Sequence, residues 1–136
     1  MKAVVDANVL FAALLRKGLT RKLLFNPELE LFSPQFVVDE FLKHRNYLVG
    51  KYGGTEEKFG RLVERTLNFI DRIPDSKLDP YAPAAKTLSP DPKDWQYLAA
   101  ALYVDAAIWS NDAGMKKQQR VRVFTTEEIA REIGTL

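Results

Sequence analysis

Short apolar runs alternate along this chain with longer segments of helical periodicity. Residues 2–5 (KAVV) and 106–109 (AAIW) place apolar side chains at successive positions, which is typical of strands buried on both faces of a sheet. Runs at 29–32 and 122–124 are further expected strands, and residues 70–73 either end the preceding helix or form a short strand. This alternation favours an α/β domain with a parallel central sheet. Because ligands of such sheets bind outside the carboxyl ends of the strands, the polar residues that directly follow a strand are of most interest.

The helices are predicted from apolar periodicity and from capping residues. They are expected over residues 9–15, 20–25, 34–49, 56–70, 92–104 and 126–134. Ser33 and Pro34 have the form of an N-cap followed by a first helical residue, and Thr125 and Glu128 have the form of a capping box. Residues 74–90 are rich in proline and are expected to be mostly loop, with one helical turn near 84–87.

Composition narrows the chemistry that the chain can perform. Its 136 residues are expected to form one domain, 1–136. The absence of cysteine excludes disulfides, a thiol nucleophile and a Cys-based zinc site, and the lone histidine, His44, argues against a His-centred triad. No apolar run approaches the roughly 20 residues that cross a bilayer, and the N-terminus makes a poor signal peptide. We therefore expect a cytoplasmic protein that is not bound to membranes.

Each of the two buried strands is followed by an acid. Asp6 directly follows the first strand, and Asp112 follows the second after Ser110 and Asn111. Turn or cap chemistry accounts well for Asp112. It accounts less well for Asp6, because apolar residues crowd Asp6 on both sides and a lone buried carboxylate is costly unless it is paired or liganded.

Two predicted helices carry further acids near their apolar faces. At 100° per residue, Glu40 lies at the edge of the apolar arc of its helix, whereas Asp39 faces solvent. An edge side chain with its head group in water explains Glu40 equally well. Asp94 shares a face with Leu98, although an acid in the first helical turn is also favoured by the helix dipole. Asp91 is explained as the N-cap of the same helix.

Four acids are thus expected to approach one another: Asp6, Glu40, Asp94 and Asp112. Carboxylates that lie close together raise one another's pKa and repel, and a divalent cation relieves that repulsion. Oxygen ligands favour the hard ions Mg²⁺ or Mn²⁺. One or two such ions can activate water and stabilise the leaving oxygen of a phosphodiester, which makes phosphodiester hydrolysis the predicted chemistry.

The segments VVDANVL, FVVDEFLKH, DPKDWQYLAAAL and IWSND occur in this order over nearly the whole chain. Together they resemble the PIN-domain ribonucleases, the metal-dependent family that includes VapC-type toxins. The family's four acids match Asp6, Glu40, Asp94 (in preference to Asp91) and Asp112. The resemblance implies a three-layer α/β/α sandwich with a five-stranded parallel sheet, an Mg²⁺ or Mn²⁺ site, RNA as substrate, an antitoxin partner for a toxin, and frequent homodimers.

The resemblance also implies supporting residues around the acids. Family members often carry a polar residue two places after the first acid, here Asn8, and a Ser or Thr two places before the fourth, here Ser110. Both are expected to orient carboxylates or the attacking water. The net charge of +2 says little by itself, but two basic clusters can meet RNA phosphates or can simply be solvated. The candidate RNA contacts are Arg16, Lys17, Lys116 and Lys117.

We therefore expect a metal-dependent endoribonuclease, and two rival functions remain. One is a non-catalytic PIN-like domain that binds RNA or protein and keeps the acids for structure. The other is a phosphatase that uses Asp6 as a nucleophile. Such phosphatases carry a second Asp two residues later, and this chain has Asn8 there.

Overall fold

The structure is a computed structural model, and residues 1–135 are described. Its strands are β1 (Lys2–Val5), β2 (Glu30–Pro34), β3 (Ile70–Ile73), β4 (Ala107–Trp109) and β5 (Val123–Phe124). Its α-helices are α1 (Ala7–Leu15), α2 (Leu19–Leu24), α3 (Gln35–Lys43), α4 (Arg45–Tyr52), α5 (Glu56–Phe69), α6 (Asp75–Leu78), α7 (Ala82–Leu88), α8 (Trp95–Val104) and α9 (Thr126–Glu132). Short 3₁₀ helices are η1 (Asp79–Tyr81), η2 (Pro92–Asp94) and η3 (Ala113–Lys117).

The five strands form one parallel sheet in the order β3-β2-β1-β4-β5, which confirms the fold expected from the resemblance. In its register Val5 pairs with Trp109, and Trp109 pairs with Phe124. Pairing continues past the strand ends, because the Asp6 amide donates to the Trp109 carbonyl at 3.2 Å and the Ser110 amide donates to the Phe124 carbonyl at 3.0 Å. The residues that follow β1 and β4 therefore leave the sheet side by side.

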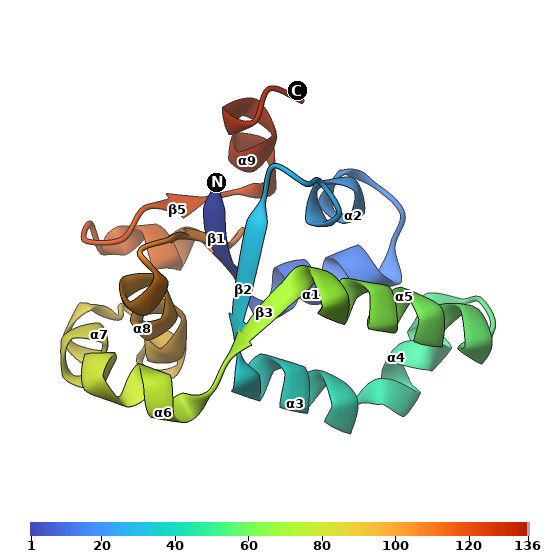
Figure 1. Ribbon diagram of the computed structural model, residues 1–136, viewed down its shortest axis with the longest axis horizontal. Helices are drawn as coiled ribbons and strands as arrows, with labels where there is room; N and C mark the ends of the chain where they lie inside the picture. The colour runs from blue at the N-terminus through green and yellow to red at the C-terminus, as the bar shows by residue number, and fades with distance from the viewer. Residues whose placement is uncertain (136) are drawn as a thin grey trace.

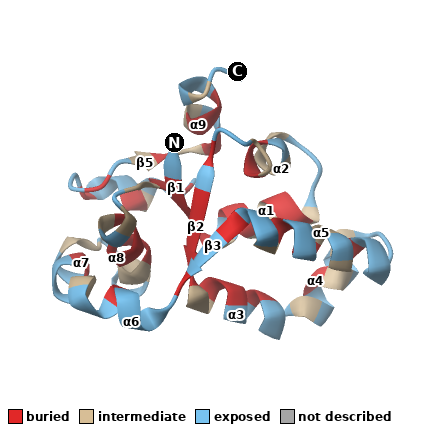
Figure 2. Ribbon diagram, viewed as in Figure 1, coloured by how far each residue is buried: buried red, intermediate tan, exposed pale blue. Residues whose placement is uncertain are grey.

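Helices cover both faces of the sheet and make a three-layer α/β/α sandwich. Figure 1 shows α6, α7 and α8 on one side of the strands and α1 to α5 on the other. The burial colouring of Figure 2 places the core in β1, β2 and the sheet-facing sides of α1 and α8. Ala3, Val4 and Ile108 are fully buried, as expected for strands with helices on both faces. None of the helices described over residues 1–135 is long and apolar enough to cross a membrane.

The start of α3 differs from the sequence prediction. Strand β2 continues through Ser33 and Pro34, and α3 begins only at Gln35. Ser33 is fully buried and pairs with Arg72 of β3, so sheet pairing takes this segment in place of helix capping. The single helix predicted to residue 49 is also divided, because the backbone at His44 (φ −101°, ψ 16°) ends α3 and precedes α4.

The proline-rich segment 74–90 is helical, contrary to the loop expected there. It forms α6, η1 and α7, and prolines stand in the first turns of η1 and α7, where a missing amide donor costs little. Leu78 and Ala85 are fully buried in this segment, which packs against α8. Burial against α8 therefore supplies the order that local propensity does not predict.

Candidate functional site

Asp6 lies at the carboxyl end of β1 and begins α1. Its carboxylate accepts a hydrogen bond from the Val9 amide at 2.9 Å, so Asp6 is the N-cap of that helix. Only 6% of Asp6 is exposed, and this burial raises the pKa of its carboxyl above the ordinary value. Hydrogen bonds from the Ser110 side chain and the Val9 amide lower that pKa, while the charge of Asp112 raises it further. The first acid of the site is thus buried, and its pKa is affected by the charge of a second acid, Asp112.

Asp94 supplies a third carboxylate from the start of α8. It occupies the N-cap position of α8 but makes no capping hydrogen bond with its side chain, so its carboxylate remains available. Capping is instead done by Asp91, which accepts from the Lys93 amide at 3.0 Å and begins η2. Burial raises the pKa of Asp94, and the charges of Asp91, Asp112 and Asp6 add to that rise.

Asp112 follows β4 and begins η3. Its amide donates to the Ser110 hydroxyl at 3.1 Å, and one of its carboxylate oxygens accepts from the Gly114 amide at 2.9 Å. Ser110 is fully buried and contacts both acids, because its side chain hydrogen-bonds to Asp6 and its hydroxyl accepts from the Asp112 amide. A hollow of about 190 Å³ lies beside these residues, and its walls include Asp91, Asp94 and Asp112.

The chain matches a known protein family over most of its length. A family model described as PIN domain matches residues 4–133. This chain belongs to the PIN domain family. The PIN fold is also that of two solved structures to which the chain is similar. They are titled the crystal structure of VapBC2 from Rickettsia felis bound to a DNA fragment from their promoter, and a toxin-antitoxin complex from Klebsiella pneumoniae.

The likeness to these structures extends over more than nine-tenths of this chain. The Rickettsia chain is 15% identical with a TM-score of 0.64, and the match covers 92% of this chain and 98% of that one. The Klebsiella chain is 12% identical with a TM-score of 0.65, and the match covers 91% of this chain and 97% of that one. A comparison with curated protein sequences gives no match. At these identities the likeness shows the fold alone.

Glu40 stands apart from the other acids of this PIN domain. It lies near the end of α3 with its side chain 51% exposed, and its nearest ionic partner is His44 at 3.4 Å. The charges that raise the pKa of Asp6 and Asp94 do not include that of Glu40. The structure therefore brings together three of the four predicted acids and leaves Glu40 facing solvent beside His44.

Tyr97 is a further neighbour of the site, and the sequence pattern does not single it out. It is buried on α8, and its hydroxyl accepts from the Ala7 amide at 3.1 Å, directly after Asp6. Burial raises the pKa of the Tyr97 phenol, and the charges of Asp6 and Asp94 raise it further, so the hydroxyl keeps its proton. An aromatic one turn into an apolar helix gives no sequence signal for this contact.

The expected supporting and basic residues divide into near and distant ones. The Asn8 side chain is exposed, and Asn8 reaches Asp6 through its backbone amide. Arg16 and Lys17 follow α1, whose nine residues span roughly 13 Å, so they lie at the far end of that helix from Asp6. Lys117 lines the acid hollow. Lys116 instead forms an ion pair with Glu128 of α9.

The donor atoms of the site fit a hard divalent cation in chemical type and in charge. They are carboxylate oxygens. The charge of Asp112 raises the pKa of Asp6, and the charges of Asp112 and Asp6 raise that of Asp94, effects that a bound cation would reverse. Within residues 1–135, however, no three His, Cys, Asp or Glu side chains already converge closely enough to hold a metal ion. The site is thus suited to a metal by its chemistry and is not preassembled around one.

Proposed function

We propose that this PIN domain is a divalent-metal-dependent endoribonuclease and the toxin of a toxin–antitoxin pair. The observation that carries the proposal is the placement of three acids: Asp6 and Asp112 follow the paired strands β1 and β4, and Asp112 lines one hollow with Asp94. These acids come from β1, α8 and β4, and no local structural rule requires them to meet. Membership of the PIN domain family supports a nuclease at the level of the family.

In this proposal Asp6, Asp94 and Asp112 would hold Mg²⁺ or Mn²⁺. Glu40 would complete the site or hold the attacking water after its half-exposed side chain turned away from His44. An ion held by these carboxylates would supply two kinds of chemistry, activation of a water molecule and stabilisation of the charge that develops on a phosphodiester. Ser110 orients Asp6 by hydrogen bonding and holds the Asp112 backbone. The buried position of Asp6 limits its access to bulk water, which strengthens its interaction with a cation.

RNA is the proposed substrate, and Lys117 is the cation best placed to bind it. Lys117 lines the same hollow as Asp94 and Asp112, where its ammonium can contact a phosphate next to the bond that is cut. Lys116 is occupied by Glu128, and Arg16 and Lys17 lie beyond the far end of α1. We therefore assign the phosphate contact at the hollow to Lys117. The toxin–antitoxin complexes of similar fold support an antitoxin as protein partner.

One observation favours the second candidate function, a non-catalytic PIN domain that binds RNA or protein. Within residues 1–135 no three acidic or histidine side chains converge on a metal position. Incubation with a pool of RNAs in Mn²⁺, with Asp6→Asn as the control, separates the two functions. Cleavage by the wild type that is lost in Asp6→Asn is expected. RNA binding without cleavage, in a protein whose melting temperature Mn²⁺ does not change, would establish the non-catalytic function.

A further inference from the structure

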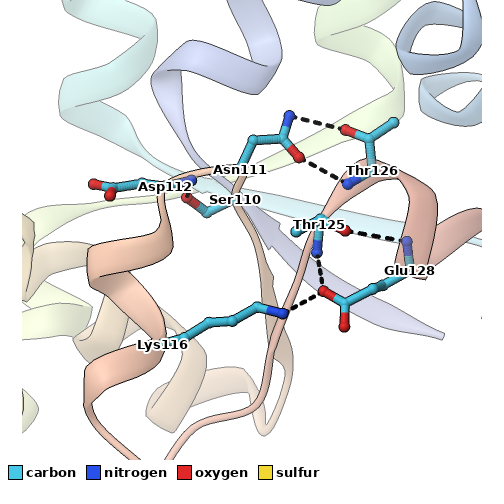
Figure 3. Close-up of polar contacts among 7 residues, drawn as sticks. All are labelled: Ser110, Asn111, Asp112, Lys116, Thr125, Thr126 and Glu128. Atoms are coloured by element: carbon cyan, nitrogen blue, oxygen red, sulfur yellow. Dashed lines mark hydrogen bonds and ion pairs between the residues drawn. The ribbon is translucent and has the colours of Figure 1, made fainter.

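The Asn111 side chain connects the end of β4 to the first turn of α9. Its Nδ2 donates to the Thr126 Oγ1 at 3.0 Å, and its Oδ1 accepts from the Thr126 amide at 2.8 Å. Because both bonds go to one residue, they fix the orientation of the Asn111 amide relative to α9. Figure 3 shows this pair of bonds on one side of the chain and the Asp112 carboxylate pointing away on the other.

Thr126 is itself held firmly by the core. It is buried, and its Oγ1 also accepts from the Nε1 of Trp109, which is fully buried in β4, at 3.1 Å. Its amide is one of the first N–H groups of α9, which have no partner within the helix. Asn111 satisfies this amide from a different element. The point to which Asn111 is tied is therefore part of the protein interior.

The other end of the segment that carries Asp112 is tied to the same helix. Lys116 forms an ion pair with Glu128, and Glu128 is fixed by its reciprocal capping box with Thr125 (Figure 3). Residues 111–116 are thus attached to the first turn of α9 at both ends, with Asp112 between the attachments. Asp112 is exposed, and its own contacts are local ones to Ser110 and Gly114.

We propose that Asn111 and Thr126 are positioning residues that fix the direction in which Asp112 enters the acid-lined hollow. They touch neither metal nor RNA and act through the backbone of Asp112. The consequence for metal binding rests on the proposed function, whereas the ordering of the loop does not. Groups that orient metal ligands typically change metal affinity by about 10- to 100-fold when they are removed.

The test compares Asn111→Ala with the rescue variant Thr126→Ser and the control Asn26→Ala. Asn26, like Asn111, accepts a hydrogen bond from a backbone amide, that of Glu28 at 2.9 Å, but it lies far along the chain from the site. In metal-free protein, hydrogen exchange at the Asp112 and Gly114 amides measures the order of the loop. Titration calorimetry with Mn²⁺ measures metal affinity, and thermal melts in EDTA verify folding.

Asn111→Ala is expected to speed exchange at both amides and to weaken Mn²⁺ binding about 10-fold or more. Thr126→Ser, which keeps the hydroxyl and the amide, and Asn26→Ala are expected to match the wild type. If Asn111→Ala does not fold, Asn111→Ser replaces it, because this variant shortens the side chain that makes both bonds to Thr126, keeps it polar and leaves the Trp109–Thr126 bond in the core untouched.

Unchanged exchange in Asn111→Ala overturns the proposal. Faster exchange with unchanged Mn²⁺ affinity also overturns it, because the contact then only stabilises α9. A wild type that does not bind Mn²⁺ at all refutes the proposed function instead, and the exchange data still decide whether Asn111 orders the loop.

Discussion

Asp6→Asn is expected to make the metal-free protein more stable and to abolish its response to Mn²⁺. Asn and Asp are equally good N-caps, so the Asn oxygen can still accept from the Val9 amide that Asp6 now satisfies at 2.9 Å. The substitution removes the charge of a side chain that is only 6% exposed. It also removes the repulsion between that charge and Asp112.

The magnitude follows from the raised pKa of Asp6. Folding raises this pKa, so at neutral pH the ionised carboxylate opposes folding by about 1.4 kcal/mol for each pH unit of the rise. In a domain of 136 residues, each 1 kcal/mol moves the melting temperature by roughly 3–5 °C. We therefore expect Asp6→Asn to melt above the wild type in EDTA at neutral pH, by roughly 4–7 °C for each pH unit of that rise. Asp6→Ala leaves the Val9 amide without its partner and so loses about 1 kcal/mol of capping energy. Its net stabilisation over the wild type should therefore be smaller than that of Asp6→Asn.

Mn²⁺ is expected to reverse this order. A ligand at 100 times its dissociation constant stabilises the folded state by about 2.7 kcal/mol, so the wild type then melts above Asp6→Asn. Scanning fluorimetry of both proteins, with EDTA and with a Mn²⁺ series, measures the two orders directly. Wild type melting above Asp6→Asn in EDTA would refute the claim that the buried charge of Asp6 opposes folding. Equal Mn²⁺ shifts in the two proteins would show that the metal does not bind at Asp6.

Two further predictions concern pH and the RNA contact. In EDTA, the free energy of unfolding is expected to rise as pH falls from neutral towards about 4. Folding raises the pKa of Asp6 and Asp94, so the folded state binds more protons than the unfolded state over this pH range. Urea melts across the range measure the rise. Below that window the trend reverses, because Lys116 and the capping contacts lower the pKa of Glu128 to about 2, and its contribution is lost on protonation. Lys117→Gln is expected to raise KM for RNA. It should also reduce the slope of log K for RNA binding against log salt concentration by about 0.7, the value for one single-strand phosphate contact. Lys17→Gln is expected to change neither KM nor this slope. An equal effect of the two lysine variants would contradict the assignment of the phosphate contact.

Much of the fold could be predicted because local and global preferences agree. The strand at 2–5, the capping box at Thr125 and the last helix form where the sequence indicates, and residues 70–73 adopt the strand, one of the two alternatives expected there. The errors occur where packing between segments that are distant in the sequence decides the secondary structure. Ser33 is drawn into β2 by pairing with β3, and Leu78 is buried against α8 in a segment whose prolines suggest a loop. Neither partner can be identified from a short window of sequence.

The site was predictable where a strand ends and less so along helices. Asp6 and Asp112 follow neighbouring parallel strands, and sheet geometry alone brings them to the same edge. The helical periodicity used for Glu40 gives its direction around the helix axis but not the distance of α3 from the sheet edge. The structure leaves Glu40 half exposed beside His44, near the end of that helix. Tyr97 is missed for the reverse reason, because a buried aromatic residue is explained by the core alone.

Local structural roles and site roles coexist in the same acids. Asp6 caps α1, and Asp112 begins η3 with a bond from Gly114, so the usual explanation for each acid holds in the structure. That explanation does not require their carboxylates to interact, yet each raises the pKa of a neighbouring acid. Asn can fill a capping role without carrying a charge. Carboxylates that repel one another lower the stability of the folded protein, and a bound cation would offset that loss. Helix capping therefore explains the geometry of these acids, but it does not explain why they are charged.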